Sequence, residues 1–317
     1  MKYALIFPGQ GSQAVGMGKD LCAVSQAARD TFAEADDALG FSLSTLCFEG
    51  PAEKLVLTAF TQPAILTASI AVYRALAEQG VQLNPAFVAG HSLGEYTALV
   101  ANGVLPLADG VRLVHKRGSF MQDAVPQGVG AMAAIIGIEA EAVEEVCAQA
   151  AQGEVCEPAN YNTPTQIVIS GHKAAVERAV ELASSRGARR SVLLNVSAPF
   201  HCSLMRPVAD KLAVEMDTCA WSQGSVPLVA NVSGKIVSSV QEIRSGLYEQ
   251  TYSSVQWVRS VQTMAAAGVE AFIELGPGKV LTGTVKKICK GVKTLNAECA
   301  ADLAAIAAFA ASAQEAN

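Results

Sequence analysis

Short apolar runs alternate with helical stretches near both ends of the chain. Residues Tyr3–Phe7 form an apolar run that stops at a proline-glycine turn, and similar runs occupy residues 86–90 and Ala271–Leu275. A short apolar run bounded by turn residues is typical of a strand buried on both faces. Helical spacing of apolar residues predicts helices at 63–78, 93–101, 280–290 and about 300–313. This alternation predicts an α/β fold built on a parallel sheet.

The middle of the chain follows another order. The predicted elements there are a strand at 129–138, a helix at 139–150, strands at 156–161 and 166–170, a helix at 173–186 and a strand at 190–196. The order β-α-β-β-α-β is the signature of a ferredoxin-like unit. We therefore expect an α/β body of residues 1–125 and 200–317, with a ferredoxin-like α+β subdomain of residues 126–199 inserted into it. Residues 122–128 are the expected entry linker.

The composition indicates a large buried core. Hydrophobic residues make up 51% of the 317 residues and charged residues 16%, against roughly 25% charged in an average soluble chain. This balance excludes a disordered protein. The net charge of −6 excludes a nucleic-acid binder with a broad basic surface, although a local basic site could still bind an anion.

The chain lacks the patterns of membrane insertion and secretion. No apolar stretch reaches the ~18 residues that span a bilayer, and the first apolar run is too short for a signal-peptide core. The eight cysteines form no C-x-x-C pair, so we expect reduced thiols in a cytoplasmic protein. Cys202 follows His201, but adjacent side chains on an extended chain point to opposite faces, which argues against a Cys-His pair.

The clearest chemical motif is Gly90-His91-Ser92-Leu93-Gly94, which fits G-x-S-x-G. It follows a predicted strand and precedes a predicted helix, as in a nucleophile elbow. The glycines permit a tight turn that exposes Ser92, and the N-terminus of the following helix can stabilise an anion. The alternative is a glycine-flanked turn with a capping serine. The context favours a nucleophilic Ser92.

A nucleophilic serine needs a base, and the chain has four histidines. His91 is adjacent to Ser92 and should point away. His115 lies on an apolar helix, where a packing role is expected, and His172 should be exposed at a turn. His201 lies where the chain returns from the inserted subdomain, so it is the expected base. In an ordinary α/β-hydrolase the serine is followed by an Asp or Glu and then by a histidine near the C-terminus. Here no histidine follows His201.

Two further segments have alternative interpretations. Gly9-Gln-Gly-Ser-Gln-Ala14 fits G-x-G-x-x-A, a weak dinucleotide-binding pattern, but no acidic residue follows a recognisable second strand. The same turn could instead supply a backbone N–H to an oxyanion.

Arg117 ends an otherwise apolar helical segment, so it is either solvated or able to bind a carboxylate through two parallel hydrogen bonds. No histidine pair has the spacing of metal ligands.

Together these motifs resemble the malonyl-CoA:acyl carrier protein transacylase family over essentially the whole chain. The motifs that carry the resemblance are Phe7-Pro-Gly-Gln-Gly-Ser-Gln13, Thr61-Gln-Pro-Ala64, Gly90-His-Ser-Leu-Gly-Glu95, Arg117-Gly118, Asn160-Tyr-Asn162, Gln166-Ile-Val-Ile-Ser-Gly171, Pro199-Phe-His201, Tyr248-Glu-Gln250, Val255-Gln-Trp257 and Glu274-Leu-Gly-Pro-Gly278. The resemblance implies a hydrolase-like α/β body with a ferredoxin-like insertion. It also implies an acyltransferase that moves malonyl from coenzyme A to acyl carrier protein and supplies fatty-acid synthesis.

The resemblance implies a role for each matching residue. Ser92 would accept the acyl group, His201 would act as its base, and Gln250 would orient the imidazole through a backbone or side-chain carbonyl. Backbone N–H groups of Gln10 and Leu93 would hold the oxyanion, Arg117 would bind the malonyl carboxylate, and Phe200 would crowd a 2-methyl branch. No metal and no cofactor are expected, because the coenzyme A thioester is a substrate.

The expected macromolecular partner, acyl carrier protein, is acidic, so basic side chains are candidates for its docking surface. The candidates are Lys286, Lys287, Lys290 and Lys293, with Arg189 and Arg190 at the end of the inserted subdomain. The alternative for the lysines is a solvated helix face.

Two other functions share the serine motif or the fold: a serine thioesterase or esterase, and a non-catalytic binding module. A polyketide carrier protein is an alternative acceptor.

Overall fold

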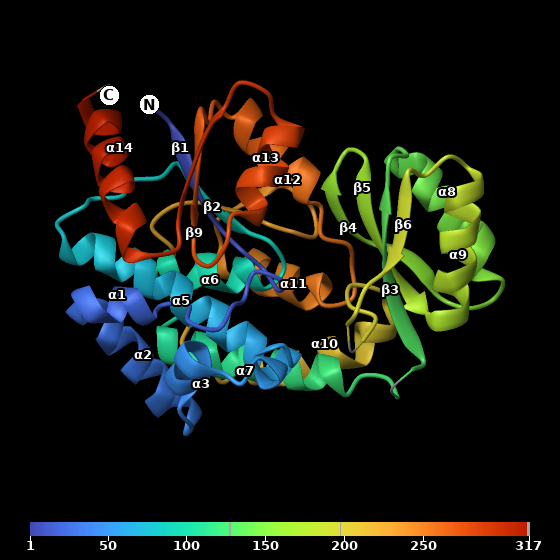
Figure 1. The fold of residues 1–317 in the computed structure, drawn as a ribbon, viewed down its shortest axis with the longest axis horizontal. Helices are drawn as coiled ribbons and strands as arrows, with labels where there is room; N and C mark the ends of the chain where they lie inside the picture. Colours follow the sequence, from blue (N-terminus) through green and yellow to red (C-terminus); the bar gives the residue numbers. More distant parts are fainter. Residues whose placement is uncertain (127, 197, 316–317) are drawn as a thin grey trace.

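Two β-sheets organise the chain in the computed structural model, which describes residues 1–126, 128–196 and 198–315 (Figure 1). The larger sheet has the strand order β10-β9-β1-β2-β7-β8. Its strands are β1 (Tyr3–Phe7), β2 (Phe87–Gly90), β7 (Leu228–Val229), β8 (Ile236–Val237), β9 (Ala271–Leu275) and β10 (Lys293–Ala297). All neighbours pair in parallel except β7 and β8.

The strands β1, β2 and β9 are buried on both faces, which explains their continuous apolar sequence. Along β1, Leu5 packs into one hydrophobic cluster and Ile6 into another, because successive side chains point to opposite faces. The cluster around Leu5 includes residues of α1 (Lys19–Val24), α2 (Gln26–Leu39), α3 (Leu43–Glu49), α4 (Ala52–Leu55), α5 (Thr58–Glu78), α6 (Leu93–Ala101), α7 (Leu107–Gln122), α10 (Arg206–Met216), α11 (Val240–Gln250) and α14 (Leu303–Glu315). The cluster around Ile6 includes α12 (Trp257–Ala266) and α13 (Val280–Ile288).

The smaller sheet is antiparallel, with the strand order β4-β5-β3-β6. Its elements are β3 (Gly130–Ile136), α8 (Ala140–Ala151), β4 (Cys156–Thr163), β5 (Gln166–His172), α9 (Lys173–Ser185) and β6 (Arg190–Leu193). The predicted fold class, a parallel-sheet α/β body with a ferredoxin-like α+β unit, is confirmed. The predicted boundaries of body and subdomain stay a prediction, and residue 127 of the expected linker lies outside the described residues.

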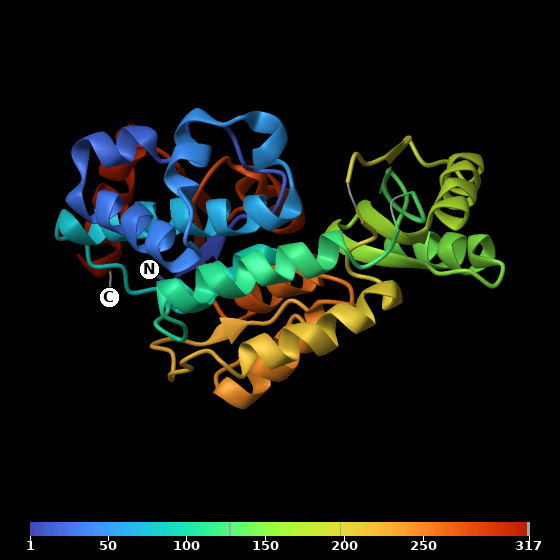
Figure 2. The ribbon, with the colours of Figure 1, turned by 90° about the horizontal axis from the view of Figure 1, so that it is seen from below.

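The antiparallel sheet uses its two faces differently. Ala133 and Ile135 of β3 pack with α8 and α9, whereas Met132 and Ala134, which alternate with them along the strand, pack in the cluster of Met121 of α7 and Phe200. Figure 2 shows α7 running from the large sheet toward the small one, with α10 alongside it. The second face of the small sheet is therefore in contact with the segments that enter and leave it.

Several elements differ from the sequence prediction. Helix α5 begins at Thr58 and includes Pro63, although proline is more typical of a helix's first position. Strand β6 ends at Leu193, before the predicted end at 196. The edge strand β10 was not predicted, because Lys293–Ala297 has the sequence KTLNA and lacks an apolar run. Helices α1–α4 and α10–α12, the 3₁₀ turns at Ser203–Met205 and Ala300–Asp302, and the two-residue strands β7 and β8 were also not predicted.

Candidate active site

The predicted nucleophile lies at the carboxyl edge of the parallel sheet. Gln10 follows β1, Ser92 follows β2 and Asn231 follows β7. Because β1, β2 and β7 run in parallel, their carboxyl ends meet at one edge. Sites in open α/β folds form at this edge.

The turn around Ser92 explains the two glycines of the motif. A Cβ atom on Gly90 would lie 2.0 Å from the carbonyl oxygen of Gly94, and one on Gly94 would lie 2.0 Å from the carbonyl oxygen of Phe7, so no larger residue fits at either position. Ser92 has a φ of 52°, a backbone conformation that a residue with a side chain rarely adopts. This strained turn places Ser92 immediately before the first residue of α6, as expected for a nucleophile elbow.

Ser92, His201 and Gln250 form a hydrogen-bonded chain. The Oγ of Ser92 is 2.7 Å from Nε2 of His201, and Nδ1 of His201 is 2.8 Å from the backbone oxygen of Gln250. A carbonyl oxygen only accepts, so Nδ1 carries the proton and Nε2 offers its lone pair to the serine hydroxyl. The contact uses the backbone carbonyl of Gln250, one of the two options left open by the sequence.

His201 is buried, with 4% of its surface exposed. Burial, followed by the positive charge of Arg117, lowers the pKa of His201 to about 3. The imidazole is therefore neutral near pH 7, which is the state that a general base requires.

Arg117 is 1% exposed, which contradicts the solvated-helix alternative. Its Nη1 donates to Oε1 of Gln62 at 2.8 Å, and its Nη2 donates to Oε1 of Gln250 at 2.9 Å and to Oγ of Ser92 at 3.1 Å. The ring of Tyr96 lies 5.2 Å from the centre of the guanidinium. All these acceptors are neutral, and burial lowers the pKa of Arg117. A carboxylate in this position would supply the missing negative charge.

Two polar residues that the sequence analysis did not single out complete this network. Glu95, 2% exposed, accepts a hydrogen bond from Nε2 of Gln250 at 2.7 Å and from the backbone N–H of Asn231 at 3.3 Å. Asn231 also accepts from the backbone N–H of Ser92 at 2.7 Å and donates to the carbonyl of Gly90 at 2.6 Å. Asn231 thus holds the serine turn in shape.

Burial raises the pKa of Glu95 to about 7, although its hydrogen bonds from Gln250 and Asn231 and the charge of Arg117 act in the other direction. A signal for this residue was present in the sequence. Glu95 is the only charged residue of α6, whose sequence is LGEYTALVA. A single charge in an apolar helix indicates a buried polar partner.

The two expected oxyanion donors belong to turns that pack against each other. The backbone N–H of Leu93 is the first of α6 and has no hydrogen-bond acceptor among the described residues. The turn that contains Gln10 packs closely against the serine turn. A Cβ atom on Gly9 would lie only 2.5 Å from the carbonyl oxygen of His91. The side chain of Gln10 donates to Oγ1 of Thr58 at 3.2 Å.

The remaining histidines have other partners. Nε2 of His91 is 2.8 Å from Oδ1 of Asn162, and Nδ1 of His115 is 2.7 Å from the carbonyl oxygen of Ala59. The expectation that His172 is exposed was wrong: it is half-buried, and its Nδ1 accepts from the N–H of Val155 at 2.9 Å. The structure brings only His201 to Ser92.

Cys202 is buried, and its Sγ lies 3.1 Å from the carbonyl oxygen of Pro199. All eight cysteines are free. Ser197, at the start of the segment that leads to His201, lies outside the described residues.

The structure does not gather all the predicted docking residues. Lys286 and Lys287 are exposed in the last turn of α13, and Lys290 is exposed just beyond it. Helix α13 contacts β4, whereas Arg190 is exposed on β6 at the opposite edge of the antiparallel sheet. Lys293 lies on β10 and not on the helix. The three lysines around the end of α13 are therefore one basic group, and Arg190 is separate from it.

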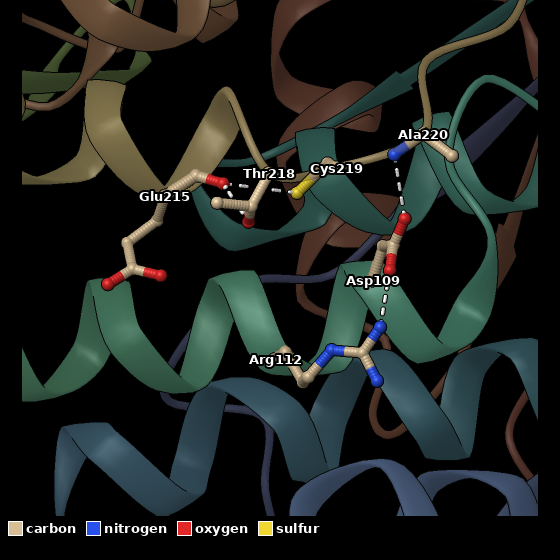
Figure 3. Close-up of polar contacts among 6 residues, drawn as sticks. All are labelled: Asp109, Arg112, Glu215, Thr218, Cys219 and Ala220. Carbon is tan, nitrogen blue, oxygen red and sulfur yellow. Dashed lines mark hydrogen bonds and ion pairs between the residues drawn. The ribbon is translucent and has the colours of Figure 1, made fainter.

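A pocket of about 240 Å³ lies between α2, α7 and α10 and contains none of the predicted site residues. Figure 3 shows Arg112 paired with Asp109 at 2.5 Å, and the carboxylate of Asp109 also accepts from the N–H of Ala220 at 2.8 Å. Lys116 lies 3.9 Å from Glu215. The charges around this pocket are thus already paired.

The described residues include no group of three or more His, Cys, Asp or Glu side chains that could hold a metal ion, and the absence of a cofactor stays a prediction. No helix among them is long and apolar enough to cross a membrane.

Comparison with known proteins identifies the class. Residues 4–307 match the acyl transferase domain family, so the chain belongs to this family and is an acyltransferase. It is 52% identical over 307 residues to the malonyl CoA-acyl carrier protein transacylase of Escherichia coli K12, covering 97% of this chain and 98% of the relative. The resemblance found in the sequence is thereby confirmed.

Two solved structures are similar over nearly the whole chain. The acyl-carrier-protein-S-malonyltransferase of Bartonella henselae is 46% identical with a TM-score of 0.96, covering 98% of this chain and 100% of that one. A malonyl-transacylase in complex with its type II PKS acyl-carrier protein is 44% identical with a TM-score of 0.95, covering 98% of this chain and 100% of that one.

The low pKa of His201 leads to a direct prediction. The His201 imidazole signal in NMR spectra of histidine-labelled protein, identified by its loss in a His201→Gln variant, should keep a constant chemical shift from pH 8 to pH 5. The unfolded chain binds this proton near pH 6.5 and the folded protein only near pH 3, so this group lowers stability as pH falls through that range. A titration midpoint near 6.5 would contradict the neutral imidazole.

Proposed function

We propose that the chain transfers malonyl from coenzyme A to the phosphopantetheine thiol of acyl carrier protein through a malonyl-Ser92 intermediate. The observation that carries the proposal is that the Ser92 Oγ atom contacts both a candidate base and a buried cation. Ser92 Oγ donates toward a neutral imidazole and also accepts from the buried guanidinium of Arg117. The names of the relatives support malonyl as the acyl group and acyl carrier protein as its acceptor.

In the first half-reaction, Nε2 of His201 takes the Ser92 proton while Oγ bonds to the thioester carbonyl carbon. The tetrahedral oxyanion is stabilised by the N–H groups of Leu93 and Gln10, and the N-terminal end of α6 adds a favourable dipole. As the carbonyl re-forms, the carbon–sulfur bond breaks. Coenzyme A leaves as the thiol after taking the proton from His201.

In the second half-reaction, the pantetheine thiol gives its proton to His201 and its sulfur attacks the ester carbonyl of malonyl-Ser92. The Ser92 oxygen then leaves and regains the proton. A carbonyl partner at Nδ1 stabilises the imidazolium less than a carboxylate would. Transfer between two thioesters is nearly balanced and has a good leaving group, so this weaker assistance is sufficient.

Acyl selectivity follows from the groups around Ser92. Arg117 would exchange its contacts with Gln62 and Ser92 for the malonyl carboxylate, which could accept two parallel hydrogen bonds from the planar guanidinium. Phe200 is 8% exposed and packs with Met121 and Met132 next to the base. A 2-methyl branch on the acyl group would be crowded by this ring.

We propose that the carrier protein docks on the basic group formed by Lys286, Lys287 and Lys290. The support is the exposure of these side chains and the net charge of −6 on the whole chain, against which a local basic group is distinctive. Lysines in a last helical turn also stabilise the helix dipole, which is the structural alternative. Fatty-acid synthesis as the pathway and a cytoplasmic location stay predictions.

Ser92 and His201 should act as one unit. Single Ser92→Ala and His201→Ala changes should each lower malonyl transfer by roughly 10³-fold or more, and the double variant should be little worse than either. The measurement is the steady-state rate with malonyl-CoA and acyl carrier protein. Multiplicative losses would show that the two residues do not share a step. Free malonate released at the rate of malonyl-CoA consumption would favour the thioesterase alternative.

Arg117 should set the preference for malonyl over acetyl. Arg117→Ala should reduce that preference by on the order of 10³-fold, because an acetyl group gains nothing from the guanidinium. The measurement compares loading from malonyl-CoA and acetyl-CoA. In the control, Phe200→Ser should keep malonyl over acetyl but admit methylmalonyl, a change worth only about 1–3 kcal/mol. An unchanged ratio in Arg117→Ala would place the carboxylate elsewhere.

Reversing two docking charges should affect only the second half-reaction. Lys286→Glu with Lys287→Glu should weaken transfer to acyl carrier protein and reduce its salt dependence, because screened long-range attraction is lost. Loading from malonyl-CoA should stay normal. Reversal of two exposed lysines elsewhere, Lys173 at the start of α9 and Lys235 just before β8, is the control. Equal damage to both half-reactions would contradict a docking role.

A further inference from the structure

The side chain of Gln250 is held between a carboxylate and a guanidinium. Its Nε2 donates to Glu95 at 2.7 Å and to the backbone oxygen of Ser92 at 2.9 Å, while its Oε1 accepts from Nη2 of Arg117 at 2.9 Å. The side chain is fully buried, so water does not replace these partners. Each end of the amide thus has a partner of the matching kind.

Only one orientation of this amide satisfies its surroundings. If it were flipped, its oxygen would face the carboxylate of Glu95 and the carbonyl of Ser92, and its NH₂ would face the guanidinium of Arg117. Three favourable contacts would become repulsive ones between like groups. The acceptor at Glu95 therefore helps to decide that the oxygen of Gln250 faces Arg117.

We propose that Glu95 is a positioning residue for acyl transfer: it fixes the side-chain amide of Gln250, which in turn aims Nη2 of Arg117 at the Ser92 oxygen. The inference rests on the proposed function, in which Arg117 binds the carboxylate of the acyl group. Glu95 itself does not contact the acyl group. It acts through the Gln250 amide that lies between it and Arg117.

The indirect arrangement has a chemical advantage. A carboxylate in direct contact with Arg117 would occupy the N–H groups that the acyl carboxylate needs. Among the ion pairs of the described residues none involves Glu95, and one amide separates it from the guanidinium. In its ionised form Glu95 stabilises the buried cation. The Gln62 and Ser92 oxygens that touch Arg117 are neutral and can be exchanged for a substrate carboxylate while Gln250 stays in place.

The contacts of Glu95 require an acceptor and not merely a polar side chain. Both groups that face it, Nε2 of Gln250 and the N–H of Asn231, are donors. Replacement by glutamine would keep the size but present an NH₂ to one of them. The oxygen of Gln250 could then turn toward this NH₂ and away from Arg117. Arg117 would then lose the contact that fixes its direction.

The test is the acyl selectivity of Glu95→Gln in single-turnover loading of Ser92 from malonyl-CoA and from acetyl-CoA. We expect malonyl loading to fall by roughly 10- to 100-fold while acetyl loading stays within about threefold, because only malonyl depends on the direction of Arg117. The concentration dependence should show a higher half-saturating malonyl-CoA concentration. A fall in the malonyl-to-acetyl ratio supports the proposal.

The matched control is Glu274→Gln. Glu274 is also fully buried, and its carboxylate accepts from the N–H groups of Leu281 at 3.0 Å and Thr282 at 2.7 Å. This variant loses a comparable buried carboxylate away from Ser92, so it should keep the acyl ratio even if it unfolds at a lower temperature.

A Glu95→Gln variant with an unchanged ratio, or with both rates reduced equally, would overturn the positioning role. If that variant does not fold, Glu95→Asp keeps the charge but draws it back by one methylene, and it must lower the ratio in the same direction by a smaller factor. Wild-type protein that forms no malonyl adduct would overturn the proposed function as well. Adduct formation with an unchanged variant ratio would overturn only the role of Glu95.

Discussion

A guanidinium buried without a direct ion pair is the constraint around which the site is arranged. A buried charge is costly unless hydrogen bonds and nearby opposite charge offset it. Arg117 is surrounded by the oxygens of Gln62, Gln250 and Ser92, with Glu95 one amide further away. The same positive charge helps to keep His201 unprotonated. Arg117 thus donates to the Ser92 oxygen and also lowers the pKa of His201.

The fold makes this network possible by bringing distant segments to one sheet edge. Ser92 and Glu95 come from the turn and helix after β2, Arg117 from α7, His201 from the return of the inserted unit and Gln250 from the end of α11. The second face of the antiparallel sheet packs around Phe200 beside the base. The two sheets therefore contribute different parts of the site: the parallel one holds Ser92, and the antiparallel one packs against Phe200 beside His201.

The features predicted from the sequence are those with local causes. The apolar runs predicted β1, β2 and β9, and the glycine spacing predicted the turn at Ser92. The polar edge strand β10 lacked such a signal. Glu95 and Asn231 were missed because their roles depend on long-range contacts. Glu95 contacts Asn231 across 136 positions of sequence and Gln250 across 155, and no local pattern encodes such contacts. The lone charge in an apolar helix was the one available indication.

The most direct measurement is the mass of the intact protein after incubation with malonyl-CoA alone, followed by peptide mapping. Without a thiol acceptor, the reaction should stop after the first half, because the ester is released only by a second thiol. One malonyl group should be present per chain, on the peptide that contains Ser92, and absent from Ser92→Ala. No adduct, or an adduct on a cysteine, would contradict a malonyl-serine intermediate.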